Sequence, residues 1–261
     1  MFSVDSYLAT LGYSGPLEPT SKTLRELQRR HLMTIPFDNS GRVDQGTASL
    51  KDVDIDLDEA FGRVVTERRG GVCFELNGMF NRLLKELGFQ TMFLGAGVRG
   101  PGGTYGPDLE HMFLGVRIGE ELWLGDVGFA GPGFIDPLQV TDGVQEQYGC
   151  QYRVFGADGY HVVERKTRTG DWQGVYRFRE QPRRLAEWVE DGGDKPEEDG
   201  WNWEGELVAA DTVIRARSFE TGQMVLVGRR LVRVDDGEEQ VRVLVKPEDY
   251  QAVVDEILGG T

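Results

Sequence analysis

The sequence predicts an α+β protein: a helical first part, an antiparallel β-barrel in the middle and an α/β end. Over residues 1–90, apolar residues recur at the three- and four-residue spacing of helices that bury one face. From about Thr91 the period falls toward two, and the short strand-like runs over 91–190 are typical of a small antiparallel barrel or sheet. Residues 204–261 combine strand-like runs with one closing helix. We therefore place domain boundaries at these positions, with 191–203 as a linker or mobile loop.

The first two helices are indicated by their ends as well as by their apolar stripes. A short stripe after the N-terminus stops at Gly12, and Thr20 or Ser21 can cap the helix that follows. This second helix ends before Pro36, because the residue preceding a proline is pushed out of the helical region. Residues 37–41 are then expected to form a turn.

A third helix is expected at about 57–65, and a fourth begins at Cys73, directly after Gly70 and Gly71. The fourth helix shows the clearest amphipathic spacing, with apolar residues at Leu76, Phe80, Leu83, Leu84 and Leu87.

A β-hairpin is the clearest prediction in the middle of the chain. His111–Ile118 alternates between two faces, Gly119 and Glu120 form a turn, and Leu122–Val127 returns as the paired strand. Further strand-like runs occupy 152–155, 160–165 and 174–178.

The end of the chain begins with the acidic segment 191–200, which shows no periodicity and is expected to be a linker or mobile loop. Whether it gates a pocket stays open at this point. A closing helix is expected from Pro247, which suits a first helical turn. It follows strand-like runs at 212–217, 223–227, 230–234 and 240–245.

Composition excludes several classes of protein. The 261 residues suffice for one large or two to three small domains, and no apolar run is long enough to span a membrane. The N-terminus lacks the pattern of a secretory leader, so a soluble cytoplasmic protein is expected. A net charge of -15 argues against nucleic acid or an anionic membrane as a partner. Two cysteines form no disulfide framework or zinc motif, and we expect no metal site.

Cys73 is the candidate nucleophile. At the first turn of a helix, unpaired N–H groups and the helix dipole favour a thiolate. Gly70 and Gly71 give the backbone freedom, and we expect them to leave room for a substrate beside the sulfur. A small core cysteine is the usual alternative for such a residue. Cys150 has no His or acid nearby in the sequence and is expected to serve packing alone.

His111 and Asp126 lie close to facing each other if the hairpin turns at Gly119. Asp126 continues the inward side of its strand, and a buried carboxylate needs a partner such as an imidazole N–H. With Cys73 they form a candidate triad in which His111 takes the thiol proton and Asp126 orients the imidazole. The thiolate would attack an acyl group, and the acyl-enzyme would pass that group to an acceptor. Of the other histidines, His31 is expected at a surface or an interface and His161 in a structural role.

These residues resemble the signature of the arylamine N-acetyltransferase family. The resemblance rests on Arg69-Gly70-Gly71-Val72-Cys73-Phe74-Glu75-Leu76-Asn77, on Asp126-Val127-Gly128-Phe129 and on the spacing of Cys73, His111 and Asp126. It implies a helical domain, a β-barrel domain and a C-terminal α/β lid, with ping-pong acyl transfer through an acyl-Cys73. Papain-like proteases and transglutaminases share the order Cys, His, acid but lack the residues around the cysteine.

Some segments depart from the typical acetyltransferase pattern: 37–40, 129–133 and 208–213. These departures favour the amide synthases of ansamycin polyketide assembly, which belong to the same family. Such enzymes take a polyketide acyl chain from a carrier-protein thioester and close it onto an aromatic amine of the same chain, forming a macrolactam. An N-acetyltransferase moving acetyl from acetyl-CoA to arylamines is the alternative, and a thioester hydrolase or an inactive binding protein also remains.

The resemblance also implies the surroundings of the triad. No cofactor is expected to be bound permanently, and the acyl donor is a carrier-protein or CoA thioester. The oxyanion site is expected at backbone N–H groups near Cys73 and Phe74. Apolar lining would exclude water and favour an aryl acceptor, and the residues expected to bind the substrate are Phe37, Val98, Phe129 and Gly131.

Overall fold

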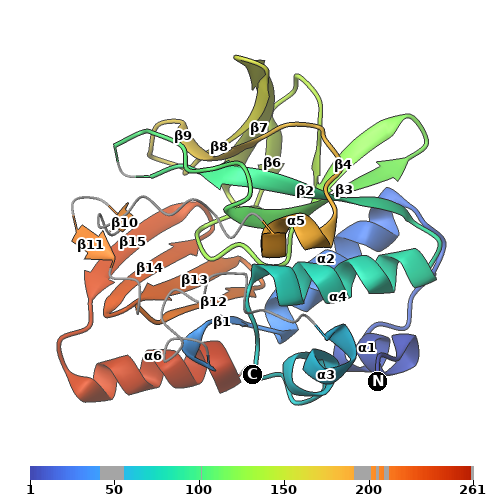
Figure 1. Ribbon diagram of the computed structural model, residues 1–261. Helices are drawn as coiled ribbons and strands as arrows, with labels where there is room; N and C mark the ends of the chain where they lie inside the picture. Colours follow the sequence, from blue (N-terminus) through green and yellow to red (C-terminus); the bar gives the residue numbers. More distant parts are fainter. Residues whose placement is uncertain (42–55, 101, 191–200, 204–205, 209–211, 260–261) are drawn as a thin grey trace.

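The computed structural model describes residues 1–41, 56–100, 102–190, 201–203, 206–208 and 212–259. Figure 1 shows helices α1 to α4 on one side of the molecule, an eight-stranded sheet above them and a five-stranded sheet beside them. The predicted α+β class is confirmed. How the chain divides into independent domains stays a proposal, and the predicted linker segment 191–200 lies outside the described residues.

The N-terminal helices form largely where the apolar stripes predict them. α1 spans Val4–Thr10, α2 spans Ser21–Thr34 and α4 spans Cys73–Glu86. Thr20 caps α2, since its side chain accepts the N–H of Thr23. The predicted third helix is split into α3, Leu57–Phe61, and one π-helical turn. These helices bury their apolar faces together with one side of the barrel sheet.

The barrel is an antiparallel sheet in the order β5-β4-β3-β2-β9-β8-β7-β6. The predicted hairpin is confirmed, with Gly119 in the left-handed region at φ 62° between its strands. The two edge strands are joined by Gln145, whose amide accepts the N–H of Gln139 and donates to its carbonyl oxygen. The strands are β2 Gln90–Val98, β3 His111–Ile118, β4 Glu121–Gly125, β5 Leu138–Gln139, β6 Gln145–Gln147, β7 Cys150–Ala157, β8 Tyr160–Lys166 and β9 Gln173–Phe178.

The C-terminal sheet has the order β1-β12-β13-β14-β15, and α6 covers one of its faces. Its other face reaches the barrel core through Val232 and Val234. The remaining elements are β1 Phe37–Asp38, α5 Leu185–Glu190, β10 Trp201–Trp203, β11 Glu206–Val208, β12 Ile214–Phe219, β13 Gly222–Val227, β14 Arg230–Asp235, β15 Glu238–Val243 and α6 Pro247–Gly259.

The turn predicted at 37–41 is wrong for its first two residues, which form strand β1. Phe37 pairs with Ala216 of β12 and also bridges in parallel to Gly71, where the N–H of Asp38 donates to the carbonyl oxygen at 3.0 Å. The side chain of Asn39 is hydrogen-bonded to residues at the start of β12. β1 therefore connects the C-terminal sheet to the segment immediately before Cys73.

The Gly70 and Gly71 pair packs closely against other parts of the chain, and the room it leaves for a substrate stays a prediction. Gly70 has φ 80°, and a Cβ there would lie 2.5 Å from the carbonyl oxygen of Pro36. A Cβ on Gly71 would lie 2.7 Å from Oε2 of Glu75. Both glycines are therefore needed for packing of the chain against itself.

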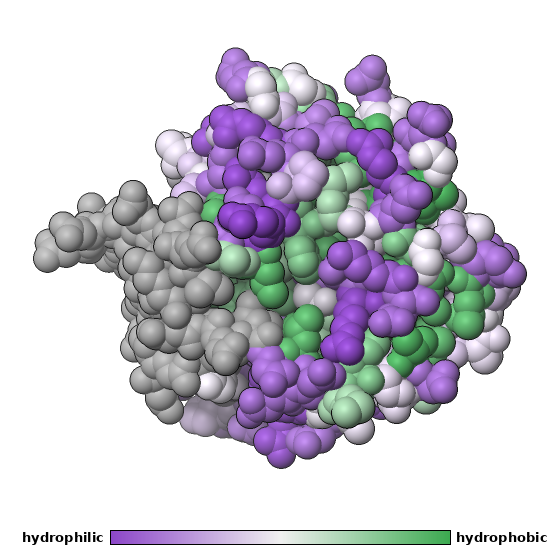
Figure 2. All heavy atoms as spheres, turned by 45° about the vertical axis from the view of Figure 1, so that its right-hand side comes forward, coloured by the Kyte–Doolittle hydropathy of each residue, from purple (hydrophilic) through white to green (hydrophobic). Residues whose placement is uncertain are grey.

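Within the described part of the chain, no helix is both long and apolar enough to cross a membrane. Hydrophobic residues do reach the surface, and Figure 2 shows them in the middle of one face, between hydrophilic residues above and below.

His31 is not at a surface or an interface, as was expected, but fully buried on α2. Its Nδ1 lies 2.8 Å from the hydroxyl of Tyr7, and burial lowers its pKa to about 3. The residue continues the buried stripe of Leu24 and Leu27, so its helical spacing was a better guide than the basic residues beside it.

This burial predicts acid sensitivity. Because the pKa of His31 is about 3 when folded and 6.5 when unfolded, the unfolded chain binds the proton first as the pH falls. The free energy of unfolding should therefore decrease below pH 6.5, by up to about 1.4 kcal/mol per pH unit from this residue. Urea unfolding at pH 7 and pH 5 should show a smaller decrease for His31→Gln than for the wild type. His161→Gln is the control, and an unchanged slope in His31→Gln would contradict the assignment.

Candidate functional site

Cys73 is the first residue of α4 and remains partly exposed. The helix start is held by Glu75, which accepts the N–H of Val72 at 3.0 Å and pairs with Arg63. An acidic side chain in the first turn stabilises the helix, and the positive end of the helix dipole favours a negatively charged sulfur. In Figure 1, α4 begins next to α5, and Cys73 packs against an apolar cluster that includes Trp188 of α5.

His111 begins β3, and its Nε2 lies 2.7 Å from Oδ2 of Asp126. Both side chains are buried. The thiol of Cys73 is the other polar neighbour of the ring, so Nδ1 is the nitrogen left to face it. His111 therefore has Asp126 and Cys73 as its polar neighbours, and the catalytic roles of the three residues stay a prediction.

The electrostatics of this group favour a protonated imidazole. Burial alone would lower the pKa of His111, but the charge and hydrogen bond of Asp126, with a further contribution from Cys73, raise it to about 10. At neutral pH the ring is therefore a cationic neighbour of the Cys73 sulfur. The arrangement can thus provide a nucleophile and, on the same ring, a proton donor for a leaving group.

Asn77 and Gly128 hold the parts of this site together, and sequence reasoning assigned neither a role. Asn77 lies one turn after Cys73, and its Nδ2 donates to the carbonyl oxygen of Met112 at 2.7 Å and to Oδ1 of Asp126 at 3.1 Å. A Cβ on Gly128 would lie 2.7 Å from the Cα of Cys73. Both residues occur in the two motifs quoted above, but only the folded chain shows what they contact.

Aromatic rings enclose the imidazole of His111. Phe113 is parallel to it with ring centres 6.0 Å apart, Phe129 meets it edge-on at 5.2 Å, and Tyr176 lies at 5.6 Å. Burial, and then the charge of Asp126, raise the pKa of Tyr176 well above its ordinary value. The rings exclude water from the pair, and an electron-rich ring face attracts a cationic imidazole.

The residues expected to bind a substrate lie at different distances from this centre. Phe37 packs against the same apolar cluster as Cys73, and Phe129 contacts His111. Val98 ends β2, two residues beyond Ala96, which pairs with His111. Gly131 is buried in the loop that follows Asp126.

The remaining expectations concern Phe74, Cys150 and metals. Phe74 is buried in the first turn of α4 beside Cys73. Cys150 lies in the barrel core, where burial raises its pKa. Among the described residues, no group of three or more His, Cys, Asp or Glu side chains could hold a metal ion.

Comparisons with known proteins agree with the geometry. A family model described as N-acetyltransferase matches residues 20–259. The chain is 35% identical over its full length to proansamycin X synthase of Amycolatopsis mediterranei strain S699, covering 98% of that enzyme. It is 34% identical to the arylamine N-acetyltransferase of Escherichia coli strain K12, over 67% of this chain and 60% of that one. The solved arylamine N-acetyltransferase of Nocardia farcinica matches with a TM-score of 0.78 and 28% identity, over 98% of this chain and 89% of that one.

The geometry predicts that the two cysteines differ in reactivity. Cys73 faces an imidazolium, whereas Cys150 is buried with a raised pKa, so iodoacetamide should label Cys73 more than about tenfold faster at pH 6.5. Peptide mass spectrometry after short exposures measures both rates. Cys150→Ala should label at Cys73 like the wild type, and equal rates at the two positions would contradict the contact of Cys73 with His111.

Proposed function

The chain belongs to the arylamine N-acetyltransferase family and is an acyltransferase, and we propose that it forms amides through an acyl-Cys73 intermediate. The main support is the contact of His111 with both Asp126 and the thiol of Cys73 at the start of α4. A nucleophile, a proton carrier and an orienting carboxylate are the groups that acyl transfer needs.

In the proposed reaction, the Cys73 thiolate attacks the carbonyl carbon of an acyl thioester. The C–S bond of the donor then breaks, and His111 gives its proton to the departing thiol. The amine attacks the acyl-Cys73 carbonyl, His111 accepts the amine proton, and the bond to Cys73 breaks to restore the thiolate. Asp126 keeps the imidazolium oriented throughout. We assign the oxyanion site to backbone N–H groups at the start of α4, that of Phe74 among them.

The proposed physiological reaction is that of an amide synthase, which closes a polyketide chain onto its own aromatic amine to give a macrolactam. The similarity to proansamycin X synthase supports this proposal, because that alignment extends over both chains almost completely. The alignment with the Escherichia coli acetyltransferase covers only 67% of this chain and 60% of that enzyme. An acetyltransferase of arylamines is the coarser alternative within the same family.

We propose that the acyl chain and the aryl amine lie along Phe37, Val98, Phe129 and Gly131. An apolar wall of this kind excludes water, and an aryl amine then competes well with hydrolysis for the acyl-Cys73. The rings around His111 give the same advantage, because they leave the acyl carbon little contact with solvent.

The proposed donor is a thioester on an acyl carrier protein or on CoA, in the cytoplasm, and no permanent cofactor is needed. A polyanionic CoA would be held best by unpaired basic groups. The cavity of about 630 Å³ beside Gly70 is lined by three arginines and three acids, so its charges balance. The arginines are Arg63, Arg68 and Arg69, and the acids are Asp38, Glu67 and Glu75. This balance gives CoA no clear advantage over a carrier-bound donor.

Product analysis tests the amide synthase assignment. The purified protein should convert an N-acetylcysteamine thioester of an amino-aryl polyketide into a macrolactam, because the acyl-Cys73 and the amine belong to one chain. Mass spectrometry should detect loss of the thiol from the substrate. Acetyl-CoA with a panel of arylamines is the comparison, and brisk acetylation without cyclisation would contradict the amide synthase assignment while leaving acyl transfer intact.

The triad assignment makes a separate prediction about turnover. Cys73→Ala should abolish it because the acyl carrier is lost, and His111→Ala should nearly do so. Asp126→Asn should lower kcat by about 10³- to 10⁴-fold, since the amide favours the wrong tautomer of His111. Circular dichroism confirms that each variant is folded. Cys150→Ala should turn over like the wild type, and loss of activity there instead of in Cys73→Ala would refute the assignment.

A further inference from the structure

The loop between β4 and β5, residues 126–137, carries Asp126, Phe129 and Gly131 but contains no strand. Its backbone N–H and C=O groups need partners outside a β-ladder, because unpaired groups are costly when buried. Side-chain amides supply many of these partners. Each comes from a different element, α2, α4, β6 and β13, and all four are buried; we call them the amide cradle, Gln28, Asn77, Gln147 and Gln223.

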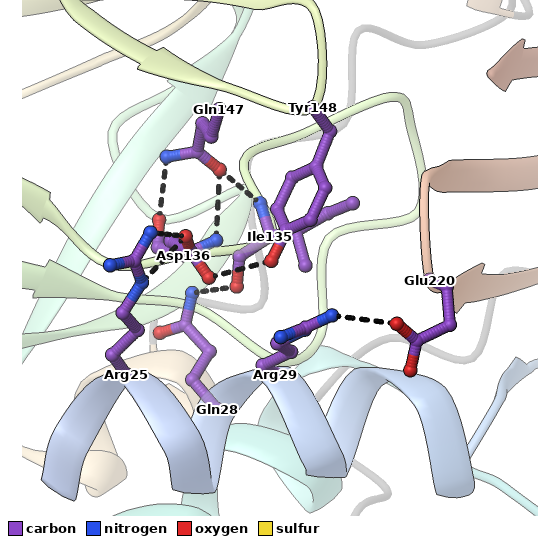
Figure 3. Close-up of polar contacts among 8 residues, drawn as sticks. All are labelled: Arg25, Gln28, Arg29, Ile135, Asp136, Gln147, Tyr148 and Glu220. Carbon is purple, nitrogen blue, oxygen red and sulfur yellow. Dashed lines mark hydrogen bonds and ion pairs between the residues drawn. The ribbon is translucent and has the colours of Figure 1, made fainter. Parts of the chain in front are cut away.

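Gln28 is fully buried on α2 and reaches both ends of the loop. Its Oε1 accepts the N–H of Asp126 at 3.1 Å, and its Nε2 donates to the carbonyl oxygen of Ile135 at 3.0 Å. Figure 3 shows the side chain rising from α2 toward Ile135, beside the contacts of Asp136 with Arg25 and Gln147. One amide group therefore fixes the candidate acid and the far end of the same loop at a constant separation.

Gln223 connects the C-terminal sheet to the middle of the loop. From β13, its Oε1 accepts the N–H of Gly133 at 3.2 Å, and its Nε2 donates to the carbonyl oxygen of Gly133 at 2.7 Å. A Cβ on Gly133 would lie 3.1 Å from the ring of Phe129, so this glycine packs closely against that ring. Phe129 in turn meets the imidazole of His111.

The two amides thus act on different parts of the site. Gln28 binds the backbone of Asp126, the residue that orients His111. Gln223 binds Gly133, which packs against Phe129, a proposed wall of the acyl pocket. A hydrogen bond to the backbone fixes a loop residue without dictating its side chain, so the cradle can position Asp126 and Phe129 independently of each other.

We propose that Gln28 and Gln223 are positioning residues with separate effects: Gln28 sets the Asp126–His111 contact, and Gln223 couples the C-terminal sheet to acyl-group selection through Phe129. This inference rests on the proposed acyl transfer through Cys73. Neither residue touches the reacting atoms.

The experiment compares Gln28→Met and Gln223→Met with Asn81→Leu, and Gln28→Leu replaces the first variant if that one does not fold. Asn81 is also a buried amide, but its Oδ1 accepts from the hydroxyl of Thr91 on β2 and not from the loop. It therefore reports what the loss of a buried amide does to stability alone. Two readouts are used with every variant: the pH profile of Cys73 alkylation by iodoacetamide, and kcat and KM for a small and a bulky aromatic p-nitrophenyl ester.

The expected results separate the two residues. Gln28→Met should slow Cys73 alkylation at pH 6 by about tenfold and move the profile to higher pH, because a looser Asp126 stabilises the imidazolium less. Gln223→Met should keep the alkylation profile of the wild type. It should raise KM for the bulky ester by roughly tenfold while kcat and KM for p-nitrophenyl acetate stay within about twofold. Asn81→Leu should change only the melting temperature.

The inference is overturned if both variants behave like Asn81→Leu, or if Gln28→Met alters ester selection and leaves the alkylation profile unchanged. A failure of the proposed function looks different. In that case wild-type Cys73 would react no faster than Cys150 at pH 6, and the triad would be rejected together with this inference.

Discussion

The buried contact between His111 and Asp126 is the interaction on which the site depends. A carboxylate without solvent is unfavourable unless several donors surround it. Asp126 has the imidazole on one oxygen, and on the other the amide of Asn77 and the N–H of Gly128. These partners come from β3, from α4 and from the loop itself, so the charge can be buried only when all of them are in place.

The same requirement explains how helices and barrel are joined. Asn77 spans the junction with one side chain, since it bonds to the β3 backbone, to Asp126 and to the N–H of Val127. Gly128 lets the loop lie directly against the start of α4. On the opposite side, β1 joins the segment before Cys73 to the C-terminal sheet. The sulfur therefore sits where three parts of the fold meet.

The sequence predicted those features that depend on local patterns. The α4 stripe and the Gly119 turn were enough to place Cys73 on a helix start and to bring His111 near Asp126, although the register pairs Leu114 with Gly125 and so does not put the two directly opposite each other. Strand β1 could not be found, because two residues show no period and their partner in β12 lies far along the chain. The prediction for His31 was wrong because it followed the basic residues beside it, and not the helical spacing that puts it on the buried face of α2. The role of an amide such as Gln28 leaves no pattern in the sequence, since its hydrogen-bond partners are backbone groups far along the chain.

The position of Cys73 at the meeting of three parts has a consequence for biosynthesis. During translation the cysteine leaves the ribosome long before the hairpin and the last sheet exist. Without the imidazole its sulfur has no proton acceptor beside it. The proposed acylation of Cys73 therefore requires the later hairpin to be folded first.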